Sequence, residues 1–264
     1  VQPVDPLDLW EGDPFDPRAI RQAAERIRAT GYFSDVEVEG REGSSPDQVV
    51  IDVDVEEQPT GSLGFSLNYS TDTGAGVAVN FSERNFLGRG QSLRFGVSTV
   101  SGGQSFNFAF NEPNFLARDV GLGFNLYYDQ TQEQNRSFDT EEYGFGTTFS
   151  FPASDNGRIA LSYSIDQTEL AFSDAAELNS SPIIVADEGE RLTSAVGLRY
   201  AFDNRATGLN PNAGVRLEFS TEYAGLGGDT EYVRTQASAI AERAILREEV
   251  TLRASFEGGA LYAL

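Results

Sequence analysis

The side chains of this chain that could take part in catalysis are carboxylates. Asp166 and Glu218 stand on the polar face of alternating segments, and either could serve as the acid of a hydrolase. The chain contains no His and no Cys, which excludes Ser-His-Asp and Cys-His catalysis and the usual zinc and iron sites. Mixed-sign charges on a polar strand face more often form ion pairs or set ion selectivity. We therefore expect no catalytic site, no metal and no cofactor.

A second group of acids alternates with valines near the N-terminus. Asp52, Asp54 and Glu56 could suggest a Ca²⁺ site, but the loop spacing and central Gly of an EF-hand are lacking. The alternation predicts instead the solvated face of a strand whose other face, with Ile51, Val53 and Val55, is buried.

The overall composition limits the possible partners. A net charge of −22 argues against nucleic acid, which needs a basic surface. No run of about 18 apolar residues is present, so no transmembrane helix is expected. This does not exclude a transmembrane β-barrel, in which half of the strand residues face a polar interior. Position 1 is Val, and we expect a processed or trimmed chain.

The first 58 residues predict a small α/β unit. Asp16 can cap a helix that begins at Pro17, and Gly31 is suited to its end. The residues at one helical face are apolar. They are Ile20, Ala23, Ala24 and Ile27. Two strands, in "YFSDVEVEG" and "DQVVIDVDVEE", follow the helix.

From Gly61 onward the helical period is replaced by strict alternation of large apolar and small or polar residues. Alternating faces lie at 63–69, 77–81, 93–97, 106–110, 122–128, 143–151, 159–165, 196–202, 215–223 and 250–256. We count about eleven strands of about 8–12 residues each. A soluble β-sandwich would also alternate. Three features favour a barrel in lipid: an apolar face nearly free of charge, aromatic residues at strand ends, and alternating short and long connections, such as 171–190. Bacterial single-chain barrels have an even number of strands, so we expect the chain to stop before closure.

A nine-residue skeleton, Phe-x-Glu-x-Asn-Phe-Leu-x-Arg, occurs twice, in "FSERNFLGRG" and "FNEPNFLARD". The chain resembles the BamA family, the assembly factors of outer-membrane β-barrels. Three motifs carry the resemblance: the run from "EGDPFDPRAIRQ" to "GSLGFSLNYS", the two "NFL" turns, and "YAFDNRATGLNPNAGVRLEF". The first resembles the end of the last POTRA domain, which is a periplasmic α/β module, running into the first barrel strand. The last resembles a mid-barrel turn.

The resemblance implies a transmembrane antiparallel β-barrel, sixteen-stranded in the family, preceded by a partial POTRA domain. Residues 1–58 would be the periplasmic POTRA part and 59–264 the N-terminal portion of the barrel in the outer membrane. The protein would not be an enzyme. It would fold and insert other barrels of a Gram-negative bacterium by strand templating at a lateral seam. Its partners would be unfolded outer-membrane protein clients, lipoprotein subunits of the assembly complex and the lipid bilayer.

The resemblance also assigns candidate site residues. The first barrel strand would pair with clients. It comprises Gly61, Ser62, Leu63, Gly64, Phe65, Ser66, Leu67, Asn68 and Tyr69. Pro59 and Thr60 would form the joint between POTRA and barrel. The periplasmic turns would contain Asn85, Phe86, Leu87 and Gly88, and then Asn114, Phe115 and Leu116, with the Phe-Leu pairs at the inner lipid interface.

Two other interpretations stay open. The small residues of the first strand could simply face a crowded interior, as Gly121, Gly123, Gly144 and Gly146 of later strands would. A sister barrel, similar to TamA or to the two-partner-secretion transporters, would share the architecture but export specific polypeptides.

Overall fold

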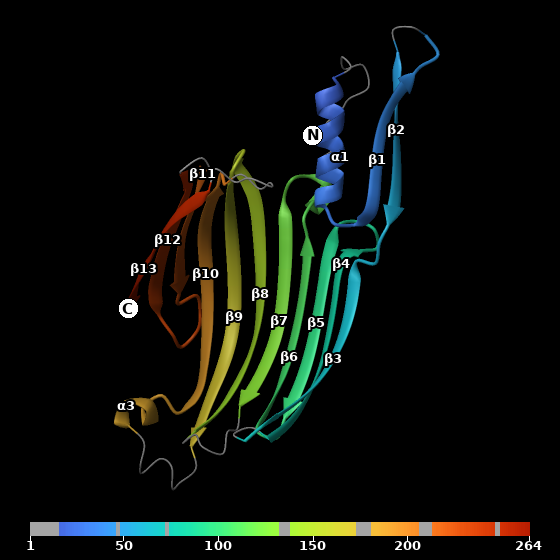
Figure 1. Ribbon diagram of the computed structural model, residues 1–264. Helices are drawn as coiled ribbons and strands as arrows, with labels where there is room; N and C mark the ends of the chain where they lie inside the picture. Colours follow the sequence, from blue (N-terminus) through green and yellow to red (C-terminus); the bar gives the residue numbers. More distant parts are fainter. Residues whose placement is uncertain are drawn as a thin grey trace.

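The computed structural model describes residues 16–45, 48–71, 74–131, 138–172, 181–205, 213–245 and 249–264. They form a small α/β unit followed by one large antiparallel sheet (Figure 1). Parts of four sequence predictions lie outside the described residues: the start of the N-terminal unit (1–15), part of the segment that joins its two strands (46–47), the long loop (173–180) and the mid-barrel turn (206–212).

Helix α1 (Pro17–Ala29) begins and ends where the sequence predicts. The Asp16 carboxylate accepts a hydrogen bond from the Arg18 N–H at 2.8 Å, and Gly31 takes the left-handed φ of 69°. The predicted apolar face is buried.

Strands β1 (Phe33–Glu42) and β2 (Val49–Glu57) form an antiparallel hairpin beside α1 (Figure 1). Val36 of β1 is buried, on the strand against which α1 packs. The prediction that Val53 and Val55 are buried is wrong, because they are 38% and 43% exposed. The physical reason is that α1 packs on β1, and no other described helix or strand covers β2.

The large sheet is a meander in which each strand pairs with its neighbours in sequence. Its strands are β3 (Gly61–Ser70), β4 (Gly74–Phe86), β5 (Gln91–Val100), β6 (Gly103–Glu112), β7 (Gly121–Thr131), β8 (Phe138–Ser154), β9 (Gly157–Phe172), β10 (Gly189–Asp203), β11 (Ala213–Ala224), β12 (Tyr232–Ile245) and β13 (Val250–Ala263). The short helices η1 (Phe115–Ala117) and α3 (Pro182–Val185) lie in its connections, at opposite ends of the strands.

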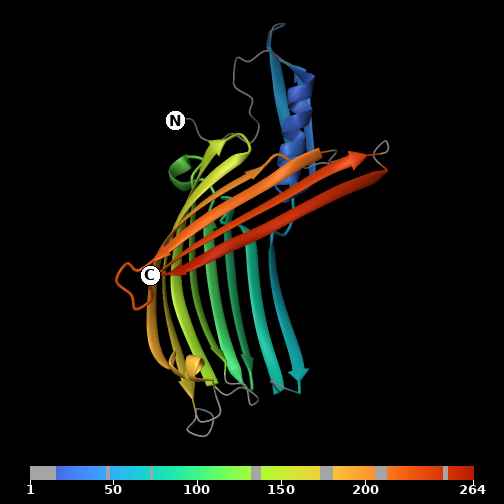
Figure 2. The ribbon, with the colours of Figure 1, turned by 90° about the vertical axis from the view of Figure 1, so that its left-hand side faces the viewer.

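The sheet curls strongly, so that β12 and β13 cross in front of the earlier strands (Figure 2). It is not closed, because β3 and β13 form its two edges. The register aligns large apolar residues in rows on one face: Leu63 pairs with Phe81, and Phe81 with Phe95. Many of these side chains are exposed, Leu161 by 48% and Phe149 by 42%, as expected of a face that lipid covers.

The other face carries small and polar residues. Gly64 pairs with Asn80, Asn80 with Gly96, and Gly96 with Asn107. The predicted fold class is therefore confirmed, with eleven antiparallel strands in the sheet. None of the described helices is long and apolar enough to cross a membrane.

One strand, β12, was not among the alternating faces that the sequence suggested. Its lipid-side row is Val233, Thr235, Ala237, Ala239 and Ala241, which pairs with a row of β13 that includes Phe256 and Tyr262. The outward row consists mostly of small alanines, and Ile240 stands in the opposite, polar row, so the alternation of large apolar with polar residues is weak there.

Candidate functional site

Strand β3 is the most exposed strand of the first half of the sheet. Its outward side chains Phe65, Leu67 and Tyr69 are 73%, 84% and 79% exposed, whereas Phe95 of β5 is 37% exposed. The difference arises because, among the described strands, β3 has a hydrogen-bonded neighbour on one side only, namely β4. All nine candidate residues from Gly61 to Tyr69 lie in this edge strand.

The ladder to β4 shows which backbone groups of β3 point to the free edge. The Arg84 N–H donates to the Thr60 carbonyl at 3.2 Å, so residues 60 and 84 are a hydrogen-bonded pair. Because such pairs alternate along an antiparallel ladder, Ser62, Gly64 and Ser66 also turn their N–H and C=O groups toward β4. Leu63, Phe65 and Leu67 then direct theirs to the side on which no described strand pairs with β3.

The joint before β3, at Pro59 and Thr60, is held by hydrogen bonds on both sides. Gln58 donates from its N–H to the Tyr32 carbonyl at 3.1 Å, and from its amide to the Gly31 carbonyl at 2.9 Å. The Thr60 hydroxyl donates to the carboxylate of Glu83 on β4. Pro59, between them, has no N–H to donate and a restricted φ. The structure thus places Pro59 and Thr60 next to the residues that directly follow α1 and next to the first repeated turn.

The two repeated turns lie at the end of the sheet next to α1 (Figure 1). They share several hydrogen bonds. Glu83 accepts from the Asn85 N–H at 2.8 Å, and Glu112 accepts from the Asn114 N–H at 2.9 Å. The Asn85 carbonyl accepts from Gly88 at 2.9 Å, and the Asn114 carbonyl accepts from Ala117 at 3.0 Å.

Both turns also place their leucine in an unusual conformation. Leu87 and Leu116 each have a φ of 57°, and Ala117 follows with 54° where the first turn has Gly88. The sequence analysis placed Leu87 and Leu116 in these turns but did not predict their left-handed conformation, because leucine is not a typical left-handed residue. It also missed Glu83 and Glu112, although the repeated skeleton itself contains them.

The interior carboxylates do not form a catalytic pair. Asp166 accepts from the Tyr127 hydroxyl at 2.5 Å, and Glu218 is paired with Arg199 and Arg216. Each acid belongs to a separate polar cluster on the inner face. No group of metal-ligating side chains occurs within the described ranges.

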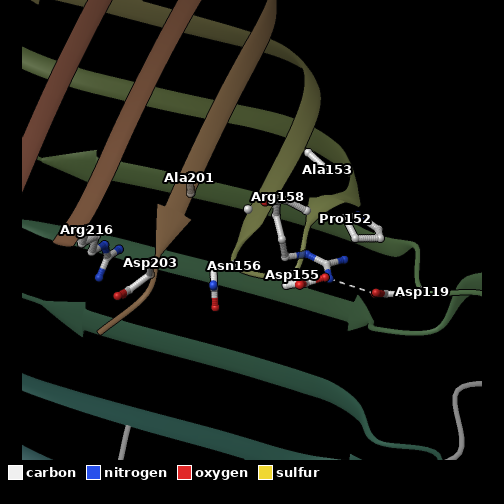
Figure 3. Close-up of a pocket in the computed structure, with 11 residues that line it drawn as sticks. Asp119, Pro152, Ala153, Asp155, Asn156, Arg158, Ala201, Asp203 and Arg216 are labelled. Carbon is white, nitrogen blue, oxygen red and sulfur yellow. Dashed lines mark hydrogen bonds and ion pairs between the residues drawn. The ribbon is translucent and has the colours of Figure 1, made fainter. Parts of the chain in front are cut away.

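A hollow of about 800 Å³ is lined by the turn between β8 and β9 and by the adjoining parts of β10 and β11 (Figure 3). Its lining carries charges of both signs, and Arg158 donates to Asp119 at 2.8 Å. The other charged lining residues are Asp155, Asp203 and Arg216. With neither His nor Cys in the chain, this polar lining contains no Ser-His-Asp or Cys-His arrangement.

Comparisons with known proteins agree with this architecture. The "Omp85 superfamily domain" family matches residues 85–263, and the POTRA family "Surface antigen variable number repeat" matches residues 5–58. The "Outer membrane protein assembly factor BamA" of Nitratidesulfovibrio vulgaris is 27% identical over 230 residues, which cover 86% of this chain and 28% of that protein. The chain thus spans less than a third of this relative.

Two solved structures share the fold. A crystal structure of BamA from Haemophilus ducreyi lacking POTRA domains 1–3 has a TM-score of 0.68 at 21% identity, covering 98% of this chain and 52% of that one. CdiB from Acinetobacter baumannii has a TM-score of 0.54 at 12% identity, covering 98% and 49%.

Proposed function

The chain belongs to the Omp85 superfamily, and from this membership we propose that the whole protein folds and inserts β-barrel proteins into the bacterial outer membrane. The protein lies in that membrane, with its N-terminal domain in the periplasm. In this proposal residues 1–58 are the periplasmic part and residues 59–264 belong to the barrel. The protein acts without catalytic chemistry, and its partners are unfolded clients and the lipoprotein subunits of an assembly complex.

The observation that carries the proposal is that β3, within the described residues, is hydrogen-bonded to a neighbouring strand on one side only. An unpaired N–H or C=O group in hydrocarbon is costly, so an edge strand in a membrane favours pairing with another strand. An incoming client strand can satisfy the free groups of Leu63, Phe65 and Leu67 by β-augmentation. Hydrogen bonds to the main chain do not depend on the client's side chains, which suits a factor that serves many clients.

The joint supports the same proposal. Hydrogen bonds of Gln58 and Thr60 hold the chain on either side of Pro59. The start of β3 is therefore connected both to the residues that follow α1 and to β4. A client delivered along the periplasmic unit would therefore reach the first residues of β3 directly.

Two substitutions at one position test the templating step. Leu63→Pro removes a free-edge N–H while leaving the bonds from β3 to β4 in place, and Leu63→Ala removes the same apolar side chain but keeps the N–H. We expect Leu63→Pro to lower the levels of several outer-membrane proteins in cells that depend on the variant, and Leu63→Ala to change them little. Equal protein levels in the two strains would contradict templating at this edge.

The sister-barrel interpretation, in which specific polypeptides are exported, is less well supported. The matched relative from N. vulgaris has the name of an assembly factor, and the structural match to CdiB is weaker than that to BamA. Depletion of the protein separates the two functions. Loss of many outer-membrane proteins is expected, whereas loss of one secreted polypeptide alone would point to export.

A further inference from the structure

Each of the two repeated turns carries an exposed leucine, an arrangement that is unfavourable in water. Leu87 is 74% exposed and Leu116 is 75% exposed, and both have left-handed backbones that Gly or Asn would adopt more easily. At each position a polar or glycine residue would thus be better suited both to the solvent and to the turn. An environment that favours an apolar side chain would offset both costs.

Each leucine is followed two residues later by an exposed arginine. Arg89 follows Leu87, and Arg118 follows Leu116. Neither guanidinium has an ion-pair partner among the described residues. Asp119, the carboxylate next to Arg118 in sequence, is held by Arg158 at 2.8 Å. Two free cations therefore stand at one end of a sheet whose chain has a net charge of −22.

The second turn is continuous with the lipid-facing side of the sheet. The ring of Phe115 meets the ring of Phe149 edge-on, with centroids 6.3 Å apart. Phe149 belongs to the apolar outward row of β8, where it pairs with Leu122 and Leu161. The apolar part of this turn thus extends the membrane-covered face toward the periplasm.

We propose that Leu87, Arg89, Leu116 and Arg118, here called the basic–apolar rim, bind phospholipids with anionic headgroups in the periplasmic leaflet of the outer membrane. The leucines enter the acyl boundary, and the guanidinium groups contact the phosphates. Cations near an anionic lipid surface are attracted to it, and apolar side chains beside them add the burial that makes such binding stable. The rim holds the start of the sheet at a fixed depth.

Lipid is favoured over a protein partner by two features of the rim. It continues a face that already contacts the bilayer. Its positive charge is opposite to the charge of anionic lipid, and it stands out from the negative net charge of this chain. The same pair, a leucine followed two residues later by an arginine, occurs at equivalent positions of two successive turns, as expected for contact with a planar surface that both turns reach.

The test uses the whole protein in detergent, titrated with phosphatidylglycerol or phosphatidylcholine, with bound lipids counted by native mass spectrometry. We expect the wild-type protein to retain phosphatidylglycerol preferentially. Arg89→Gln and Arg118→Gln should each reduce this preference roughly fivefold, as expected for one cation at an anionic surface. Leu87→Asn with Leu116→Asn should reduce retention of both lipids. Asn tolerates the left-handed conformation, so these variants should still fold.

Matched controls separate this contact from other effects. Arg41→Gln removes the same charge from the β1–β2 hairpin, and Leu226→Asn removes a leucine that is 49% exposed at the opposite end of the strands. Both should retain lipid as the wild type does, and free glycerol phosphate should not compete. Unchanged lipid retention in the rim variants would overturn the proposal. It would also be overturned if the rim variants kept their lipid and instead lost a bound protein subunit. The assembly function is scored separately, by outer-membrane protein levels.

Discussion

Leu87 and Leu116, 29 residues apart in sequence, have the same left-handed φ of 57°. The repeated skeleton therefore repeats a backbone conformation as well as a set of letters. The two turns diverge one residue later, where Gly88 has a φ of 69° and Ala117 a φ of 54°.

This divergence predicts a stabilising substitution. Ala117→Gly removes a left-handed alanine, and we expect the free energy of unfolding to rise by about 0.5–1 kcal/mol. Ala109→Gly, in the middle of β6, should lower it by about 0.5–1 kcal/mol, since glycine weakens an extended strand. Urea unfolding in lipid vesicles measures both. A fall in stability for Ala117→Gly would mean that the alanine side chain contributes more than its backbone costs.

Glu83 is predicted to hold the angle between the periplasmic unit and the sheet. Its carboxylate accepts from both the Thr60 hydroxyl and the Asn85 N–H, whereas Glu112, its equivalent in the second turn, has no contact with the joint. The chain has no Cys, so spin labels can be placed on introduced cysteines at Glu25 of α1 and Thr99 of β5. Glu83→Ala should broaden the distance distribution between the labels, and Glu112→Ala should leave it unchanged. Equal distributions in both variants would show that the joint is held by other contacts.

Two inner-face glycines are expected to respond differently to a methyl group. A Cβ on Gly64 would come no closer than 3.9 Å to another atom, so Gly64→Ala should fold normally. A Cβ on Gly144 would lie 2.8 Å from the ring of Tyr127 and would also collide with Asp166. Gly144→Ala should therefore destabilise the sheet by about 1–3 kcal/mol. Heat-modifiable gel migration and urea unfolding check this, and a normal Gly144→Ala variant would contradict the close packing.

The α/β unit is expected to unfold without the sheet. Ile27 of α1 is 7% exposed, and Ile27→Ala should destabilise the unit by about 2–4 kcal/mol. Limited proteolysis should then cleave α1 and the β1–β2 hairpin faster, while the heat-modifiable migration of the barrel stays unchanged. Loss of both signals together would show that the two parts fold as one unit.

The sequence was sufficient for those features that have a strong local signal. The cap at Asp16, the buried face of α1 and the alternation that ends in Phe81, Phe110 and Phe151 each follow from residue type and spacing. The alanine-rich β12 was missed because its outward row lacks large apolar side chains and its polar row contains Ile240. The exposure of Val53 depends on what packs beside β2, and the roles of Glu83 and Glu112 depend on where a folded turn brings backbone N–H groups. Neither is encoded in local spacing.

The near-identity of the two turns also bears on how such a sheet changes in size. Excision of residues 86–114 would remove β5 and β6 and join Asn85 directly to Phe115, which restores one complete Glu-x-Asn-Phe-Leu-x-Arg turn. Because the removed segment begins and ends at equivalent points, β4 would continue into β7 through a connection that the chain already uses. A hairpin bounded by matching turns is thus a unit that recombination can delete or duplicate. Strand number in this architecture would then change in steps of two.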